Sequence, residues 1–332
     1  MLNNKLIISA LVMFISQISV AIETIKADGS STVFPITEAV AEEFQTVEKN
    51  QIRVTVGISG TGGGFKKFCR GETDVQNASR PIQKSEIEEC RKVGVKYIEL
   101  PVGYDATVVV VNPKNKWVNE ITTADLKKIW EPSAQGKLLK WNQIQAQWPE
   151  ENLKLYGAGA DSGTFDYFTE AIVGKSKSSR GDYTASEDDN TLVLGVSKDI
   201  HSLGYLPLAY YEENKSKLKA LAVISSEGKS ANKPVLPSKA TVENGTYSPL
   251  SRPIFIYVNA EALTKPHVKK FTEFYLEQAP RLVPQVKYVA LPTKAYEIGK
   301  ENLKKNKLGT VFGGHSEVGL SIEKLLKKES LL

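Results

Sequence analysis

Cysteine, histidine and methionine are all scarce in this sequence. The 332 residues include two cysteines, three histidines and two methionines. His201, His267 and His315 are scattered along the chain, and none of them lies near a cysteine. Because protein metal sites need clustered ligands, we expect no metal, and no cofactor motif is present either.

Charge of one sign is not concentrated anywhere in the chain. Lys and Arg number 43 against 38 Asp and Glu, a formal net charge of +5, and the basic residues are spread out. A nucleic-acid-binding surface needs dense Lys and Arg interleaved with aromatic residues, so we expect no nucleic-acid partner. The small positive excess would help to attract a small anion.

Long hydrophobic runs are missing after the first residues. Lys5, the apolar run from Leu6 to Ile15 and the small residues Ser19-Val20-Ala21 are typical of a secretory signal peptide over residues 1–21, cleaved near Ala21. No cysteine stands directly after the cleavage site, so a lipid anchor is not indicated, and no later run is long enough to span a bilayer. We therefore expect an exported protein.

The exported chain of roughly 310 residues exceeds what one hydrophobic core usually holds, so we expect two lobes. Cys69 and Cys90 fall in the same expected lobe, and an exported pair most simply forms a disulfide. The disulfide would close a loop of roughly 20 residues, which stabilises the fold by about 3 kcal/mol.

The most informative stretch is Ser59-Gly60-Thr61-Gly62-Gly63-Gly64-Phe65. The alternating residues 52–58 before it predict a strand, and the spacing of Phe65, Phe68 and Cys69 predicts a helix. The glycines would then lie at a helix N-terminus, whose unpaired N–H groups and partial positive charge favour an anion. Gly29-Ser30-Ser31-Thr32-Val33-Phe34-Pro35 and Asp161-Ser162-Gly163-Thr164-Phe165 have the same composition, so three loops could converge on one anion.

Two common phosphate-binding motifs are excluded. The dinucleotide fingerprint G-x-G-x-x-G fails because Phe65 stands at its last glycine, and the Gly-Lys-Ser/Thr end of an NTPase loop is absent. A hydrolase with Ser59 or Ser162 as nucleophile is disfavoured, since no histidine lies in a recognisable motif and Thr61 stands where a nucleophile elbow requires glycine.

Strands and helices alternate along the chain, which predicts α/β lobes with mostly parallel sheets. In such sheets ligands bind at the carboxyl ends of strands, where all three loops fall. Residues 174–189 are polar and Ser-rich and predict a long loop, and Ser85 with Glu88 predicts a capping box. We expect helices at 36–47, 85–93, 123–130, 165–172, 190–200 and 268–277, and strands at 97–102, 107–111, 153–156, 204–206, 221–224 and 252–258.

Four motifs in order resemble the periplasmic phosphate-binding proteins of ABC phosphate importers, over about residues 25–308. They are Asp28–Pro35, Ser59–Gly64, Asn77–Ile82 and Asp161–Phe165. The resemblance implies a two-lobed, type II-like periplasmic-binding-protein fold with the ligand in the interlobe cleft. Crossover strands would lie near 104–107 and 252–255, dividing residues 22–105 plus 256–332 (lobe I) from residues 106–255 (lobe II).

The function implied by this resemblance is that of a high-affinity phosphate receptor, not an enzyme. It would be a periplasmic monomer that delivers inorganic phosphate to an ABC permease in the inner membrane. A receptor for another tetrahedral oxyanion (sulfate, molybdate or arsenate) is the closer alternative, and a secreted phosphatase is the more distant one.

The resemblance also implicates a set of phosphate-binding residues. Many family members have Asp where this chain has Arg80, and Arg where it has residues 157–160, so Arg80 is the candidate cation. Discriminating phosphate from sulfate needs an acceptor for the proton of phosphate, for which Asp161 leads and Asp28, Glu187 and Asp188 are weaker candidates. Arg180 would be a second charge or a solvated loop residue. The predicted site comprises Ser31, Thr32, Val33, Ser59, Thr61, Arg80, Asp161, Ser162, Gly163 and Thr164.

Overall fold

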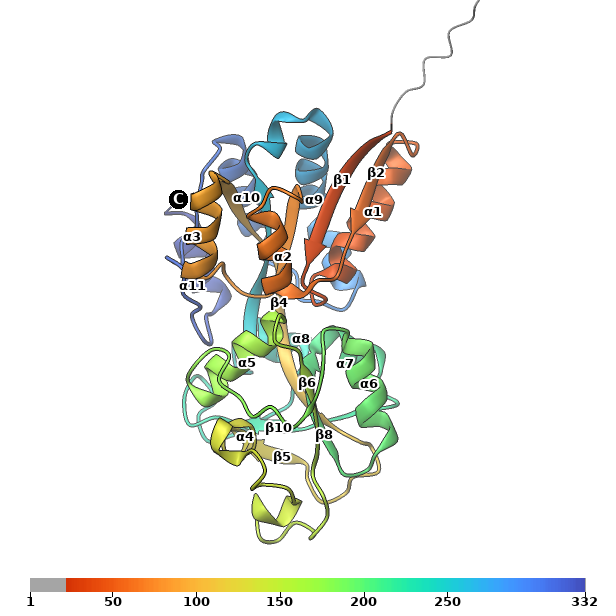
Figure 1. The fold of residues 1–332 in the computed structure, drawn as a ribbon, viewed down its shortest axis with the longest axis vertical. Coiled ribbons are helices and arrows are strands. Elements are labelled where there is room, and N and C mark those ends of the chain that lie inside the picture. The colour runs from red at the N-terminus through yellow and green to blue at the C-terminus, as the bar shows by residue number, and fades with distance from the viewer. Residues whose placement is uncertain (1–21, 332) are drawn as a thin grey trace, which may run out of the picture.

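Two long strands, β4 (Tyr97–Val111) and β12 (Ser251–Asn259), join the two parts of the molecule (Figure 1). They pair antiparallel from Tyr97 opposite Asn259 to Ala106 opposite Ser251, and every residue of both strands is buried. This computed structural model describes residues 22–331, so the predicted signal peptide lies outside the described residues. Residues 104–107 and 252–255, which the resemblance implies as crossovers, lie within these two strands.

The two lobes are α/β units built on either side of this strand pair. In the first lobe β2, β1 and β3 are parallel, and β12 lies between β3 and β4 as an antiparallel neighbour. In the second lobe the last residues of β4 pair antiparallel with β8, and β8, β6 and β7 are parallel. The predicted two-lobed α/β fold is confirmed, and in the main sheet every antiparallel pair involves β4 or β12. A separate three-stranded sheet pairs residues 222–224 parallel with residues 120–122 and antiparallel with residues 234–235.

The elements of the first lobe have the following bounds: β1 (Glu23–Gly29), α1 (Phe34–Val47), β2 (Ile52–Val56), α2 (Gly60–Phe68), β3 (Val75–Ala78), α3 (Lys84–Val93), α9 (Pro266–Gln285), α10 (Thr293–Lys304) and α11 (Ile322–Glu329). Those of the second lobe are β5 (Glu120–Thr122), α4 (Thr123–Trp130), β6 (Lys154–Ala158), α5 (Gly163–Val173), β7 (Thr184–Ser186), α6 (Asp189–Lys198), β8 (Ser202–Pro207), α7 (Leu208–Glu213), β9 (Lys219–Ala220), β10 (Ala222–Ile224), β11 (Pro234–Val235) and α8 (Lys239–Glu243). Short 3-10 turns occur at Pro132–Ala134, Trp141–Gln143 and Ala262–Thr264.

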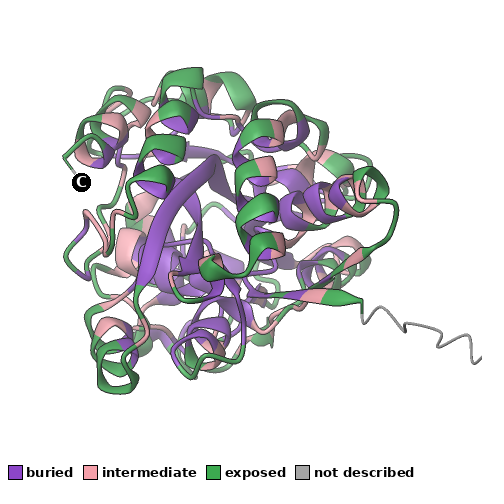
Figure 2. Cartoon of the chain, turned by 90° about the horizontal axis from the view of Figure 1, so that it is seen from above, coloured by how far each residue is buried: buried purple, intermediate pink, exposed green. Residues whose placement is uncertain are grey.

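The core lies between the sheets and the inner faces of the helices. Figure 2 shows buried strands at the centre and helices exposed on their outer sides. Helix α1 buries Ile36, Val40 and Phe44, four residues apart, because a helix returns to the same face at that spacing. Phe44 meets Phe271 of α9 edge-to-face, with ring centroids 5.2 Å apart, so the first and last parts of the chain share one core.

Three local predictions are wrong. The capping box of α3 is formed by Gln83 and Glu86, not by Ser85 and Glu88, because the Glu86 carboxylate accepts a hydrogen bond from the Gln83 N–H at 2.8 Å. The predicted strands 97–102 and 107–111 are one continuous strand. The long loop at 174–189 contains β7, which pairs parallel with β6.

The predicted disulfide between Cys69 and Cys90 is confirmed and links the end of α2 to α3. Over residues 22–331, no helix is long and apolar enough to cross a membrane. In the same described range, no group of three or more His, Cys, Asp or Glu residues is arranged to hold a metal ion.

Candidate functional site

The three hydroxyl-rich loops each lead into the N-terminus of a helix. Residues 30–33 connect β1 to α1, Ser59 precedes α2, and Ser162 precedes α5. Pro35 stands in the first turn of α1, as the sequence predicts. The glycines from Gly60 onward lie inside the first turns of α2, not before it. Three helix N-termini therefore offer N–H groups and partial positive charge.

Close approach of neighbouring groups explains why glycine occupies the start of α2. Gly60 has φ +72°, and a Cβ added to it would lie 2.5 Å from the carbonyl oxygen of Asp161 in the second lobe. A Cβ on Gly64 would lie 2.2 Å from the side-chain oxygen of Gln76. The Gly62 N–H donates to the same Asp161 carbonyl at 2.9 Å. The α2 N-terminus thus contacts the third loop directly, across the two lobes.

Hydroxyl groups from both lobes meet at this contact. Thr61 Oγ1 lies 3.1 Å from Ser79 Oγ and accepts a hydrogen bond from the Ser79 N–H. A Cβ added to Gly163 would lie 2.4 Å from Ser79 Oγ and 2.5 Å from Thr61 Oγ1. Thr32 Oγ1 and Thr164 Oγ1 lie 3.2 Å apart. The structure therefore brings Thr32, Thr61, Gly163 and Thr164 together, and it adds Ser79, which the sequence analysis did not assign.

The remaining predicted hydroxyls lie in the same loops with partners of their own. Ser162 accepts the Thr164 N–H at 3.1 Å as the N-cap of α5. Ser59 Oγ donates to Asp28 and accepts from Lys67 Nζ at 2.7 Å. The Val33 N–H donates to the Ser30 carbonyl as the chain turns into α1.

Ser31 contacts an acid that sequence reasoning missed. Its Oγ donates to Asp189 Oδ2 at 2.9 Å, from the first lobe to the first residue of α6. Burial raises the pKa of Asp189 to about 7, although the Ser31 hydrogen bond opposes that shift. The sequence places Asp189 at a helix start, where its capping role is the ordinary interpretation, but Asp188 is the residue that caps α6.

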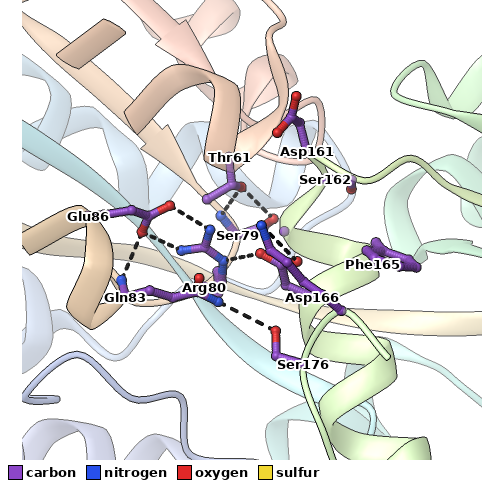
Figure 3. Close-up of polar contacts among 12 residues, drawn as sticks. Thr61, Ser79, Arg80, Gln83, Glu86, Asp161, Ser162, Phe165, Asp166 and Ser176 are labelled. Carbon is purple, nitrogen blue, oxygen red and sulfur yellow. Dashed lines mark hydrogen bonds and ion pairs between the residues drawn. The ribbon is translucent and has the colours of Figure 1, made fainter. Parts of the chain in front are cut away.

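Arg80 is buried between two carboxylates (Figure 3). Its Nη1 and Nη2 each donate to one oxygen of Glu86 at 2.8 Å, and its Nε donates to Asp166 Oδ2 of α5 at 2.6 Å. Burial alone would lower the pKa of the guanidinium, but the charges and hydrogen bonds of Glu86 and Asp166 outweigh burial and raise it. Arg80 therefore links the two lobes, with its charge already balanced.

The Asp166 carboxylate is only partly satisfied by hydrogen-bond donors. Burial raises the pKa of Asp166, and the Arg80 charge opposes that shift. Its Oδ1 is buried and has no hydrogen-bond donor among the described residues, with Lys177 Nζ 4.0 Å away. Asp166 lies in the first turn of α5, so the helix that carries the third loop also carries the partner of Arg80.

A second buried guanidinium contacts the third loop. Arg252 of β12 donates from Nη1 to the Gly163 carbonyl at 2.8 Å and from Nη2 to Thr164 Oγ1 at 2.7 Å. Its Nη2 also donates to Asp105 of β4 at 3.0 Å. Burial raises the pKa of Asp105, and the charge of Arg252 opposes that shift. In the sequence, the sign of this role was that Arg252 stands at the start of an otherwise apolar predicted strand.

The acidic candidates occupy different positions around the loops. The Asp161 side chain is 44% exposed and pairs with Lys66, while its main chain contacts α2. Asp28 pairs with Lys67, and Glu187 accepts the Asp161 N–H at 3.0 Å. Arg180 is neither solvated nor part of this site, because it is buried against Asp182 and the Ile129 and Leu138 carbonyls.

Two α/β lobes joined by crossing strands, with helix N-termini of both lobes meeting between them, define the class of two-lobed substrate-binding proteins. Comparisons with known proteins agree. The model of a family described as the PBP superfamily domain matches residues 17–279. Protein SphX of Synechococcus elongatus is 57% identical over 92% of this chain and 89% of its own length. The phosphate-binding protein PstS of Staphylococcus saprophyticus is 38% identical over 82% of each chain.

Solved structures show the same likeness. A possible phosphate-binding protein from Planctomyces limnophilus is 46% identical, with a TM-score of 0.63 over 86% of this chain and all of that chain. A putative phosphate transporter substrate-binding protein with bound phosphate, from Clostridium perfringens, has the same fold at 22% identity, with a TM-score of 0.67 over 81% of this chain and all of the other. The chain belongs to the PBP superfamily and, within it, to the family of the SphX and PstS proteins.

Proposed function

We propose that this protein is an extracytoplasmic receptor that closes around inorganic phosphate and delivers it to the permease of an ABC transporter. The observation that carries the proposal is the meeting of Thr32 with Thr164, and of Thr61 and Ser79 with Gly163, at helix N-termini of opposite lobes. A small tetrahedral anion bound there would receive donors from both lobes at once. The names of the SphX and PstS relatives support the same ligand class and transport role.

In this proposal the hydroxyl and N–H donors of the loops supply most of the binding energy. Hydrogen bonds to a charged ligand contribute about 1.5 to 3 kcal/mol each. The ligand set is the one that the sequence predicts, with Ser79 added. The Nη2 of Arg80 lies 3.8 Å from where a Cβ on Gly62 would be, so the guanidinium borders the first turn of α2.

Two buried arginines, Arg252 and Arg80, would support phosphate binding in different ways. Arg252 holds the Gly163 carbonyl and the Thr164 hydroxyl, and we assign to it the placement of the third loop against the anion. Arg80 is bonded to carboxylates of both lobes, and we assign to it a stabilising role in the closed form together with its predicted contact to phosphate.

The wider organisation is proposed on the same basis. Residues 22–105 with 256–332 would form lobe I, and residues 106–255 would form lobe II, hinged at β4 and β12. The chain would be exported by its signal peptide, cleaved near Ala21, and act as a periplasmic monomer beside an inner-membrane permease.

A binding role is favoured over catalysis by the partners of the two candidate nucleophiles. Ser59 Oγ is bonded to Asp28 and Lys67, and Ser162 Oγ caps α5. The Lys67 amine donates to Asp28 as well as to Ser59, so it is engaged as a hydrogen-bond donor on both sides. The relatives carry the names of binding proteins.

Titration calorimetry of the exported chain against phosphate, arsenate, sulfate and molybdate tests the proposal. We expect micromolar or tighter phosphate binding and no heat with sulfate. Binding of sulfate or molybdate in preference to phosphate would instead support the oxyanion alternative. Turnover of a chromogenic phosphate ester, abolished in Ser59→Ala, would support a phosphatase, and no binding of any oxyanion would refute a receptor role.

A further inference from the structure

The chain between α10 and α11 crosses from one lobe to the other and back. We infer that residues 309–321, named here the C-terminal strap, tie the second lobe to the first and limit how far the two lobes open. In Figure 1 this part of the chain descends from the region of α3 and α11 toward α5. The family match ends at residue 279, so the strap lies outside it.

The strap begins firmly attached to the first lobe. The Gly309 N–H donates to the Tyr97 carbonyl at 2.9 Å, and the Val311 N–H donates to the Glu99 carboxylate at 3.1 Å. The Gly314 carbonyl accepts from the Lys84 N–H at the start of α3. Phe312 is buried and packs edge-to-face on Phe255, 5.6 Å between centroids.

The next residues contact the second lobe. The Gly319 N–H donates to the Tyr167 hydroxyl of α5 at 3.1 Å. Burial raises the pKa of Glu170, one turn further along α5, and the nearby Ser316 side chain opposes that shift. A Cβ on Gly319 would lie 3.1 Å from Ser248 Oγ, so the strap also touches the segment before β12.

The strap then returns through the hinge. The Tyr104 hydroxyl of β4 donates to the Leu320 carbonyl, within the paired crossover strands. Helix α11 follows at once, with Leu325 fully buried and the Glu329 carbonyl accepting from the Asn302 side chain of α10. Both ends of the strap are therefore held by the first lobe, while its middle holds the second.

The strap contacts α5, the helix whose N-terminus carries the third loop of the proposed binding site. The N-terminus of α5 carries the third loop, and Tyr167 and Glu170 lie on the same helix. Opening the lobes would move α5 away from the first lobe, so it would have to break the Gly319 hydrogen bond and separate Ser316 from Glu170, or stretch the strap. The Tyr167 hydroxyl is buried and also bonded to the Pro249 and Ser251 carbonyls, which places the anchor at the hinge.

The inference rests on the proposed lobe closure, and its test is separable from phosphate binding. Spin labels at Glu42→Cys on α1 and Lys127→Cys on α4, both exposed, report the distance between the lobes by double electron–electron resonance. Without phosphate, we expect Tyr167→Phe and Ser316→Ala each to lengthen and broaden the distance distribution. Tyr247→Phe is the matched control, because it removes a buried hydroxyl bonded to Thr107 and does not touch the strap.

With phosphate, we expect the same two variants to release the ligand about fivefold faster, the effect of losing one hydrogen bond. Distance distributions identical to the wild type in both variants would overturn the inference, even if phosphate binds as proposed. If phosphate does not bind at all, the receptor proposal fails, while the distances still decide whether the strap restrains the lobes. Ser316→Ala removes only a strap hydroxyl, so it keeps the test open if Tyr167→Phe does not fold.

Discussion

Thr32 and Thr164 are separated by 132 residues, yet their hydroxyl oxygens lie 3.2 Å apart. Thr32 precedes α1 in the first lobe, and Thr164 stands in the first turn of α5 in the second. Two helix N-termini therefore face one point between the lobes. A ligand that bonds to both would stabilise the closed form selectively, because only that form offers both sets of donors.

Arg80→Ala is expected to weaken the fold as well as binding. The change leaves the buried Glu86 and Asp166 carboxylates without their cation, which typically costs about 3 to 5 kcal/mol. Urea unfolding measures this loss, and titrations should show weaker binding of phosphate and other dianions alike. Arg70→Ala is the matched control, since its pair with Glu72 is exposed and its removal should leave the midpoint unchanged. An Arg80→Ala protein as stable as the control would contradict the account.

Asp161→Asn is expected to erode selectivity more than affinity. An amide can donate a hydrogen bond to a fully ionised oxyanion, whereas a carboxylate repels it, so the preference for phosphate over sulfate should fall about tenfold or more. Competition titrations with both anions measure the ratio. Glu187→Gln is the parallel variant, because Glu187 bonds to the Asp161 N–H. Equal losses for both anions in Asp161→Asn would refute its role, and a selective effect of Glu187→Gln would transfer the role to Glu187.

Asp189 should make stability fall as the pH rises. Its pKa is raised to about 7 in the folded chain, whereas an unfolded aspartate titrates near 4, so the folded state binds the extra proton between these values. Relative to Asp189→Asn, the wild type should lose up to about 1.4 kcal/mol of unfolding free energy per pH unit over that window. Unfolding curves of both proteins at pH 4.5 and 7.5 give the difference. If the unfolding free energy of the wild type, relative to that of Asp189→Asn, stays constant or rises between these pH values, Asp189 is not protonated in the fold.

Removing the disulfide should destabilise the first lobe without altering the site. Cys69 and Cys90 are separated by 21 residues, and a loop of that size corresponds to about 3 kcal/mol. Cys69→Ser with Cys90→Ser should show this loss in urea unfolding, while phosphate affinity stays unchanged where the variant is folded. A large loss of affinity in the folded variant would mean that the bond positions α2 for binding.

Local patterns in the sequence were sufficient to predict the three loops and the disulfide, and the chain length was sufficient to predict two lobes. The Ser59–Gly64 stretch alone is compatible with an ordinary strand-to-helix turn, and the recurrence of its composition in two other loops is what favoured an anion site. The crossover strands were predicted from the family resemblance and lie where β4 pairs with β12. The loops are visible in residues that are close together in the chain, whereas the crossover strands were inferred from four motifs in order.

Partners distant in the sequence could not be predicted from such patterns. Arg252 reaches Thr164 across 88 residues, and Arg80 reaches Asp166 across 86, so neither pair has a periodicity to show it. The capping box of α3 was predicted two positions too late, although its contacts are local. Glu86 accepts hydrogen bonds both from the Gln83 N–H and from the Arg80 guanidinium, which it contacts with both oxygens.

The most direct test of the central claim is the phosphate affinity of Thr32→Val, Thr61→Val and Thr164→Val, measured by calorimetry beside Thr46→Val. Thr46 is exposed on α1 and bonds only to its own helix, so it controls for the loss of a threonine hydroxyl. We expect each of the three site variants to bind phosphate about tenfold to a hundredfold more weakly, and the control to bind as the wild type does. Wild-type affinity in variants from both lobes would contradict the account.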